Sequence, residues 1–150
     1  GEFKKALSMD SSGVTESLIT AFRRHQGETE SVVNLSGAMY RIALNDEICK
    51  KFCEGDFIVT LMTLLQCHAG HADVTHAILL LFKQLSVSDT VKSSLVESGQ
   101  FVTVAAETLL PDNLDDKVVL LRVMYILTNL MLRNPAVAEH FAASLDGLKH

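Results

Sequence analysis

An apolar helical stripe that occurs three times at nearly constant spacing is the feature that most constrains the fold of this chain. Its first copy has apolar residues at Leu35, Ala38, Met39 and Ile42. This i, i+3, i+4, i+7 spacing marks one side of an α-helix. The stripe begins again 43 residues later at Ile78 and a further 45 residues later at Val123. A buried helix side that returns at this period indicates a helical repeat protein.

A second alignment supports the same period in a different part of the repeat. Residues 18–27 and 61–70, offset by 43, share Leu, Thr, His and Gly at four corresponding places. Strand signals are scarce, so the pattern predicts an all-α fold. A glycine near the end of each segment is a typical helix stop.

The composition of the 150 residues places the chain among globular proteins. Hydrophobic residues make up 48% and charged residues 21%, which excludes a disordered chain. No apolar run reaches the roughly 18 to 20 residues of a membrane span, and no signal peptide is recognisable. Three cysteines are an odd number and favour an intracellular, cytoplasmic location. A net charge of −5 provides no overall attraction to nucleic acid or to a membrane surface.

The turn signals divide the chain into units. We expect a cloning remnant and flexible lead-in over 1–13, then a repeat domain over 14–150. Its repeats span about 14–45, 46–88 and 89–133, followed by a helix over 134–148, and we expect further repeats or domains of a longer protein. The long helices are predicted over about 30–44, 73–87 and 117–133. Expected helix caps and breaks are Asn45 or Asp46, Asp89, Asp115 or Asp116, a break over Pro111–Asp116, and stops at Gly55 and Gly99.

This order of a short helix, a glycine, a medium helix and a long helix resembles the armadillo repeat. Residues 125–130, Tyr-Ile-Leu-Thr-Asn-Leu, resemble the long-helix signature of that family. The resemblance covers about residues 14–150. It implies a right-handed α-solenoid of three-helix repeats whose long helices line a groove that holds a partner segment. HEAT repeats, which have a similar period but two helices per repeat, are the alternative.

The resemblance also implies a ladder of Trp and Asn residues in members that bind nuclear-localisation peptides. Here the Trp column reads Gly37, Leu80, Tyr125 and the Asn column reads Arg41, Gln84, Asn129. Only the third repeat keeps something like the pair. A transport adaptor for signal peptides is therefore ranked below the other functions.

The distribution of charge indicates what a groove of this kind would bind. Residues 31–45, 74–88 and 117–133 contain no Asp or Glu but hold Arg41, Lys83, Lys117, Arg122 and Arg133. One interpretation is a neutral-to-basic groove for an acidic segment, with arginines contacting carboxylates. The other is that acids gather at helix starts for capping, and that the long helices are too buried to hold charge. The predicted contact residues are Asn34, Arg41, Gln84, Arg122, Tyr125, Asn129 and Arg133.

Sites of chemistry are not indicated by these residues. His68, His71 and His76 match no common zinc spacing, and we expect a solvated turn and no metal or cofactor. Cys49 and Cys53 are interpreted as small core residues, with a redox or metal role as the alternative. Nucleotide-binding, phosphate-binding and hydrolase motifs are absent, so we expect no enzyme.

The sequence therefore predicts a non-catalytic protein–protein interaction scaffold that binds a partner segment, possibly acidic, along the long helices. The alternative is a structural spacer or capping part of a larger armadillo protein whose own groove is idle. Neither reading involves nucleic acid or membrane insertion.

Overall fold

The structure is a computed structural model and describes residues 11–148. The first ten residues of the expected lead-in over 1–13, and with them the expected cloning remnant, lie outside this range. Residues 11–13 do not continue the lead-in, because helix α2 (Ser11–His25) already begins at Ser11. Two serines in a first helical turn are consistent with the preference of short polar side chains for helix starts.

The described residues are helical throughout, with turns between the helices and no strand. The first unit holds α2 and α3 (Thr29–Ile42). The second holds α4 (Asp46–Cys53), α5 (Phe57–Cys67) and α6 (Ala72–Leu85). The third holds α7 (Asp89–Ser98), α8 (Gln100–Val104), the π-helical turn η1 (Ala105–Leu109), α9 (Leu110–Asp112) and α10 (Lys117–Arg133), and α11 (Ala136–Leu148) follows. All of these helices are too short or too polar to cross a bilayer.

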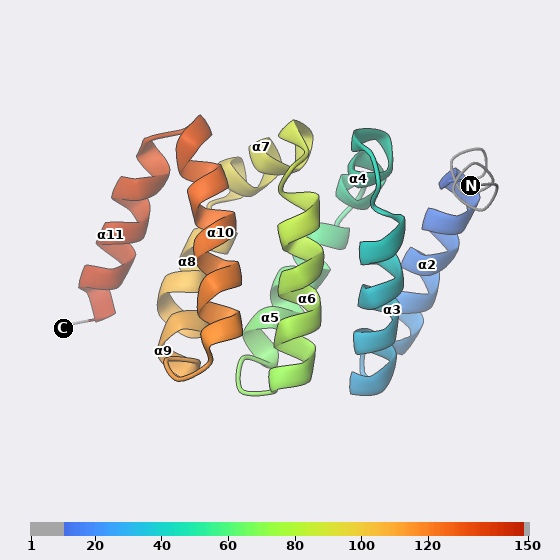
Figure 1. Ribbon diagram of the computed structural model, residues 1–150, viewed down its shortest axis with the longest axis horizontal. Helices are drawn as coiled ribbons and strands as arrows, with labels where there is room; N and C mark the ends of the chain where they lie inside the picture. The colour runs from blue at the N-terminus through green and yellow to red at the C-terminus, as the bar shows by residue number, and fades with distance from the viewer. Residues whose placement is uncertain (1–10, 149–150) are drawn as a thin grey trace.

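The three long helices lie side by side in one layer and run in the same direction (Figure 1). Helix α6 is the middle one and contacts both α3 and α10. Helices α2, α5 and α8 form a second layer behind them, and the short helices α4 and α7 lie where the long helices end. The repeated order in the sequence therefore becomes a repeated order in space.

The predicted apolar stripe forms the core between these layers. Ten of its twelve residues are buried, and the other two, Leu35 and Ala38, are half-buried on the first long helix. Leu35, Ile78 and Val123, the corresponding first members, pack in one hydrophobic cluster. Burying a side chain of this size stabilises a fold by about 1.5 to 3 kcal/mol. The prediction that three equivalent helices share one apolar core is confirmed.

The helix boundaries agree with most of the predicted caps. The Asn45 side chain accepts a hydrogen bond from the Ile48 amide at 3.0 Å, and Asp116 accepts one from the Val119 amide at 3.2 Å. The N-cap of α7 is Ser88 and not Asp89 as predicted. Asp89 instead starts the helix, where its carboxylate lies in the first turn and is favoured by the helix dipole.

Both predicted glycine stops adopt the left-handed conformation, with φ of 65° at Gly55 and 64° at Gly99. Gly99 also lies close to α11. A Cβ atom at Gly99 would come within 3.0 Å of the His140 ring, and His140 Nε2 lies 3.2 Å from Thr103 Oγ1. The contact with Thr103 joins α11 to α8.

The predicted break over Pro111–Asp116 is confirmed at 113–116, but it starts two residues later than expected, because the chain remains helical through Asp112. The π-helical turn η1 directly precedes α9, in which Pro111 occupies one of the first positions. A wider turn is one way for a helix to accommodate a residue that lacks an N–H group. The helical segment from Phe101 to Asp112 is therefore one residue longer than the equivalent helix α5. Its first residue follows Phe57 by 44 residues, whereas its last residue follows Cys67 by 45.

Candidate protein-binding surface

Each long helix has four sides, and the hydrogen bonds identify two of them. Gln84 Nε2 donates to the Ala43 carbonyl at 2.8 Å, so this side of α6 faces α3. Asn129 Nδ2 donates to Ser86 Oγ at 3.3 Å, so the Ser86 side of α6 faces α10. The third side is the buried stripe, and the fourth is the exposed face of the helix layer.

The two hydrogen bonds are equivalent contacts in successive units. Gln84 and Asn129 are 45 residues apart, and their acceptors at Ala43 and Ser86 are 43 residues apart. In each case a side-chain amide near the end of one long helix reaches the end of the preceding long helix. A hydrogen bond of this kind contributes about 0.5 to 1.5 kcal/mol and fixes how far one helix slides along the next.

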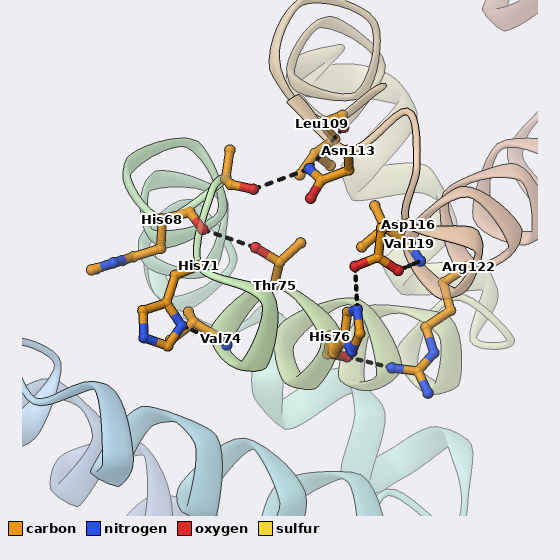
Figure 2. A network of polar contacts seen from close by, with 11 residues as sticks. His68, His71, Val74, Thr75, His76, Leu109, Asn113, Asp116, Val119 and Arg122 are labelled. Atoms are coloured by element: carbon orange, nitrogen blue, oxygen red, sulfur yellow. Dashed lines mark hydrogen bonds and ion pairs between the residues drawn. The ribbon is translucent and has the colours of Figure 1, made fainter. Parts of the chain in front are cut away.

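A further polar contact joins the starts of α6 and α10 (Figure 2). His76 Nε2 lies 2.6 Å from Asp116 Oδ2, and the other oxygen of Asp116 caps α10. The hydrogen bond with His76 is the largest cause that lowers the pKa of Asp116, followed by the bond from the Val119 amide. Arg122 Nη1 donates to the His76 carbonyl at 2.6 Å, so α10 forms two hydrogen bonds with the first half of α6.

The neighbouring turns are held by a second set of contacts (Figure 2). Asn113, buried after α9, donates from Nδ2 to the carbonyls of Ala69 at 3.0 Å and Leu109 at 2.9 Å. Thr75 Oγ1 donates to the His68 carbonyl at 2.8 Å. Sequence reasoning missed Asn113, whose only signal is its place at a helix end before an acidic loop.

The histidines of this region have separate structural roles. His71 is the N-cap of α6, where Nδ1 accepts weakly from the Val74 amide at 3.5 Å, and the rings of His68 and His71 lie 6.4 Å apart. His76 instead bonds to Asp116. Among residues 11–148, no three His, Cys, Asp or Glu side chains are grouped so that they could hold a metal ion.

The cysteines of α4 are placed as structural residues. Cys49 is buried and Cys53 packs at the edge of the same core. Burial raises the pKa of each thiol to about 11. Neither is a thiolate at neutral pH, and the thiolate is the reactive form.

Three of the predicted contact residues bond to the neighbouring long helix. Gln84, Arg122 and Asn129 are half-buried, and their polar groups make the bonds described above. Asn34 and Arg41 are exposed and lie on the corresponding side of α3, which has no long helix before it in the described residues. Tyr125 lies on the exposed face, and the side chain of Arg133 is outside the described part of the chain.

The charge asymmetry of the long helices is smaller than the sequence indicated. Helices α3 and α6 begin one residue before Glu30 and Asp73, so each contains an acid in its first turn. Each acid lies three residues before another residue of its helix, Val33 in α3 and His76 in α6. This spacing puts the acid on the same side of the helix as that residue, which is the exposed face. The first turn can hold an acid because the helix dipole favours it there. Bases are found toward the other end of the layer, at Arg41 and Lys83.

An apolar stripe, which we call the α10 stripe, runs along the exposed face of the third long helix and is interrupted only by Thr128. It consists of Val118, Leu121, Tyr125 and Leu132, which are exposed by 39%, 61%, 43% and 79%. The spacing of three, four and seven residues places them on one side of the helix. The corresponding residues of α6 are Asp73, His76, Leu80 and Val87, so the middle helix has a mixed face.

Lys83 joins the faces of α6 and α10. Its Nζ lies 4.7 Å from the centroid of the Tyr125 ring, which is within the range of a cation–π contact. This contact places a positive charge beside the middle of the α10 stripe. Lys83 was recognised in the sequence as a base of the long helix but was not among the predicted contact residues.

The ends of the long helices carry a second exposed apolar row. Leu44, Val87 and Leu132 are repeat-equivalent residues, and they are exposed by 50%, 54% and 79%. A hollow of about 130 Å³ lies between the first two, lined also by Cys49 and Gln84. This is below the roughly 300 Å³ of a small-molecule site and has the size of a single side chain.

Comparisons of the chain with known protein families, with curated proteins and with solved structures each found no match.

Proposed function

We propose that the chain is a non-catalytic scaffold of armadillo-like three-helix repeats that binds a partner segment along the exposed face of α3, α6 and α10. The proposal is supported by three parallel long helices at the sequence period, by a second helical layer behind them, and by left-handed glycines after α4 and α7. In this proposal the layer of long helices is the inner surface of a right-handed α-solenoid.

The observation that carries the proposal is where exposed apolar side chains gather. The large ones in the described residues are Leu44, Val59, Val87, Leu114, Val118, Leu121, Met124, Tyr125 and Leu132. Six of these nine lie on the exposed face of the long helices, namely Leu44, Val87 and the four residues of the α10 stripe, whereas Val59 lies in the second layer. Scattered apolar residues are normal on a protein surface, whereas a concentration on one face is typical of an interaction site.

The charges on this face suggest the chemistry of the partner. Lys83 lies beside Tyr125, and Arg41 is exposed near the end of α3, so the half of the layer toward the helix ends is basic. Glu30 and Asp73 make the other half acidic. A partner segment would place apolar side chains on the α10 stripe and a carboxylate near Lys83. A basic signal peptide fits this half less well, which keeps the transport adaptor below the other readings.

A display experiment with a matched control tests the proposal. A library of random peptides is selected on the immobilised chain, and selected peptides are measured by fluorescence anisotropy. We expect apolar residues with at least one Asp or Glu, binding that is lost in Leu121→Glu, and binding that persists in Val59→Glu. Val59 is 49% exposed, so the control adds the same charge at a comparable position in the other layer. Equal loss in both variants, or no selected peptide, would contradict the proposal.

The alternative function is a structural spacer within a larger protein. It is favoured by one observation: Gln84, Arg122 and Asn129, which could contact a partner, instead bond the long helices to each other. Charge reversal separates the two functions best at Arg41, because Arg122→Glu would also break the bond to the His76 carbonyl. The scaffold proposal expects Arg41→Glu to weaken binding of acidic peptides without lowering the melting temperature. A spacer would show no binding to weaken.

We place this function inside the cell, in the cytoplasm, because the free thiols of Cys49, Cys53 and Cys67 suit a reducing compartment. Fractionation of cells that express the protein, with detection by a specific antibody, tests this expectation.

A further inference from the structure

The hollow between the ends of α3 and α6 lies at a junction inside the described chain and not at either end of the helix layer. It has a volume of about 130 Å³, and two of its walls are Leu44 and Val87, which are exposed by 50% and 54%. Helix α10 packs on the other side of α6, and α2 packs against α3. A further unit at either end would extend the layer without reaching this hollow.

Two small side chains leave the hollow open. Ala43 and Cys49 line it and are each 1% exposed, so they lie at its bottom. At the next junction the corresponding residues are Ser86 and Lys92. The longer side chain of Lys92 is only 18% exposed and extends toward Asp89, with Nζ 3.7 Å from Oδ1. The open hollow therefore follows from the residues of the first junction and not from the repeat itself.

Two hydrogen bonds across the junction hold the walls of the hollow in place. Gln84 Nε2 donates to the Ala43 carbonyl at 2.8 Å, and Ser88 Oγ donates to Asp46 Oδ1 at 2.5 Å. All four residues line the hollow. A site whose walls are already fixed loses less conformational entropy when a ligand binds than a site that must first be ordered.

The size and the walls of the hollow indicate which side chain it would take. Apolar cavities of about 150 Å³ bind a single molecule as large as benzene, so this hollow has room for one aliphatic side chain. Leu44 and Val87 present aliphatic carbon atoms to such a side chain. Its burial between them would remove apolar surface of all three residues from water.

Asp46 is the charged residue among those that line the hollow. Its side chain is 53% exposed, and its Oδ2 lies 3.1 Å from Lys50 Nζ of the same helix. An exposed ion pair of this kind is weak, because water screens both charges. A positive charge in a ligand at the rim would therefore still be attracted to this carboxylate.

We propose that the hollow takes one aliphatic side chain of the partner segment, a Leu or Ile whose neighbour in that segment is a Lys or Arg close to Asp46. This inference rests on the proposed function, because it names two residues of the segment that the long helices bind. Asp46 begins α4, beyond the end of α3, so the base that it attracts is distinct from the carboxylate expected near Lys83.

Two capped dipeptides test the hollow without the rest of a partner. Acetyl-Leu-Lys-amide and acetyl-Ala-Lys-amide are titrated into the full chain, and the ¹³C-methyl resonances of Leu44 and Val87 are followed. We expect saturable shifts of both residues with the leucine peptide, and about tenfold weaker binding of the alanine peptide, which lacks the carbon atoms to be buried. Val59, 49% exposed in the second layer, should not shift. Equal binding of the two peptides, or no shift at Leu44 and Val87, would overturn the proposal.

Matched variants test the wall and the charge separately. Val87→Ala should weaken binding of the leucine peptide, whereas Val59→Ala should not, and both positions are exposed enough for the fold to persist. Acetyl-Leu-Glu-amide should bind about threefold more weakly than acetyl-Leu-Lys-amide. This preference should disappear in Asp46→Asn, whose side chain can still accept the hydrogen bond from Ser88. A preference that survives in this variant would contradict the assignment of Asp46.

Isotope-filtered NOEs identify what fills the hollow. We expect NOEs from the methyl groups of Leu44 and Val87 to the leucine of the peptide. NOEs to a second copy of the chain, or to residues 1–10 of the same chain, would assign the hollow to the protein itself, and the proposal would be wrong. Leu121→Glu, which should abolish binding of the display-selected peptides, should leave the dipeptide shifts unchanged. Failure of this inference can therefore be told from failure of the proposed function.

Discussion

Helices α6 and α10 occupy the same place in successive units but differ in what surrounds them. Within residues 11–148, helix α6 lies between two long helices, whereas α10 contacts one of them. Both bury the same core stripe, and both reach back to the preceding helix with an amide. They differ on the exposed face, which is mixed on α6 and apolar on α10. They also differ on the side that holds Leu79 in α6 and Met124 in α10, where Leu79 is 0% exposed and Met124 is 44% exposed. Packing therefore constrains two sides of a repeat helix and leaves the others free to acquire function.

The largest difference between the two helices should appear when equivalent residues are truncated. Leu79→Ala removes a side chain that is 0% exposed and leaves a cavity, so we expect a loss of about 2 to 5 kcal/mol in the free energy of unfolding. Met124→Ala, at a position 44% exposed, should cost less than about 1 kcal/mol. Urea unfolding monitored by circular dichroism measures both. Equal losses would mean that Met124 is covered in solution.

A smaller effect is expected from the amides that join the helices. Gln84→Ala removes a 2.8 Å bond to the Ala43 carbonyl and should lower the free energy of unfolding by about 1 to 2 kcal/mol. Asn129→Ala removes a longer, 3.3 Å bond to a hydroxyl group that can rotate to another acceptor, so it should cost about half as much. Thermal unfolding of the two variants beside the unchanged chain tests this order. The reverse order would show that the α6–α10 junction is the tighter one.

A third difference concerns the two helix starts, since α10 is capped by a carboxylate and α6 by a histidine. The bond with His76 lowers the pKa of Asp116 in the folded state below its ordinary value. A carboxyl group whose pKa is lower in the folded state stabilises the fold at a pH above its unfolded-state pKa, which is about 3.9 for Asp. This stabilisation is lost as the pH falls through the folded-state pKa. Asp116→Asn should therefore be less stable than the unchanged chain at pH 6, and the difference should shrink below about pH 4.

Melting temperatures of both proteins between pH 3 and pH 7 measure this effect. Asp46→Asn is a useful comparison, because the pKa of that carboxyl is also lowered, mainly by a hydrogen bond from Ser88, but it lies between α4 and α7. Amide exchange should show that Asp116→Asn loosens the start of α10 and Asp46→Asn does not. Loosening at α6 alone would contradict the assignment of Asp116 as the cap of α10.

The parts of the fold that depend on period could be predicted from sequence. The core stripe, the long helices, Gly55 and Gly99 follow from the spacing of apolar residues and from helix-end chemistry. The helix was expected to end before Pro111, but the π turn before it, which no local signal announces, lets the helix continue through Pro111 to Asp112. A break was therefore expected where the helix continues.

The contact residues were harder to predict for a geometric reason. Arg41, Gln84 and Asn129 form a polar column beside the core stripe, and polarity alone suggested a binding surface. Which polar column faces the neighbouring helix depends on how the helices rotate against one another, and that rotation is set by packing of the whole layer. Val118, Leu121 and Leu132 of the α10 stripe can be recognised in the sequence. A second row of apolar residues on a helix, however, predicts that this side is also buried in the core. Exposure distinguishes the two, and exposure is a property of the structure.

The smallest predicted effect tests whether the faces of α6 and α10 act as one surface. If the contact between Lys83 and Tyr125 is maintained in solution, a double-mutant cycle with Lys83→Met and Tyr125→Leu should give a coupling of about 0.5 to 1 kcal/mol. The contact is partly accessible to solvent, so 0.5 M salt should reduce the coupling without abolishing it, because part of the attraction comes from the ring at short range. A coupling of zero would mean that Lys83 moves freely. In that case the positive charge would still lie near the α10 stripe, but it would not be held there to receive a carboxylate, and selected peptides should show no fixed spacing between their acidic and apolar residues.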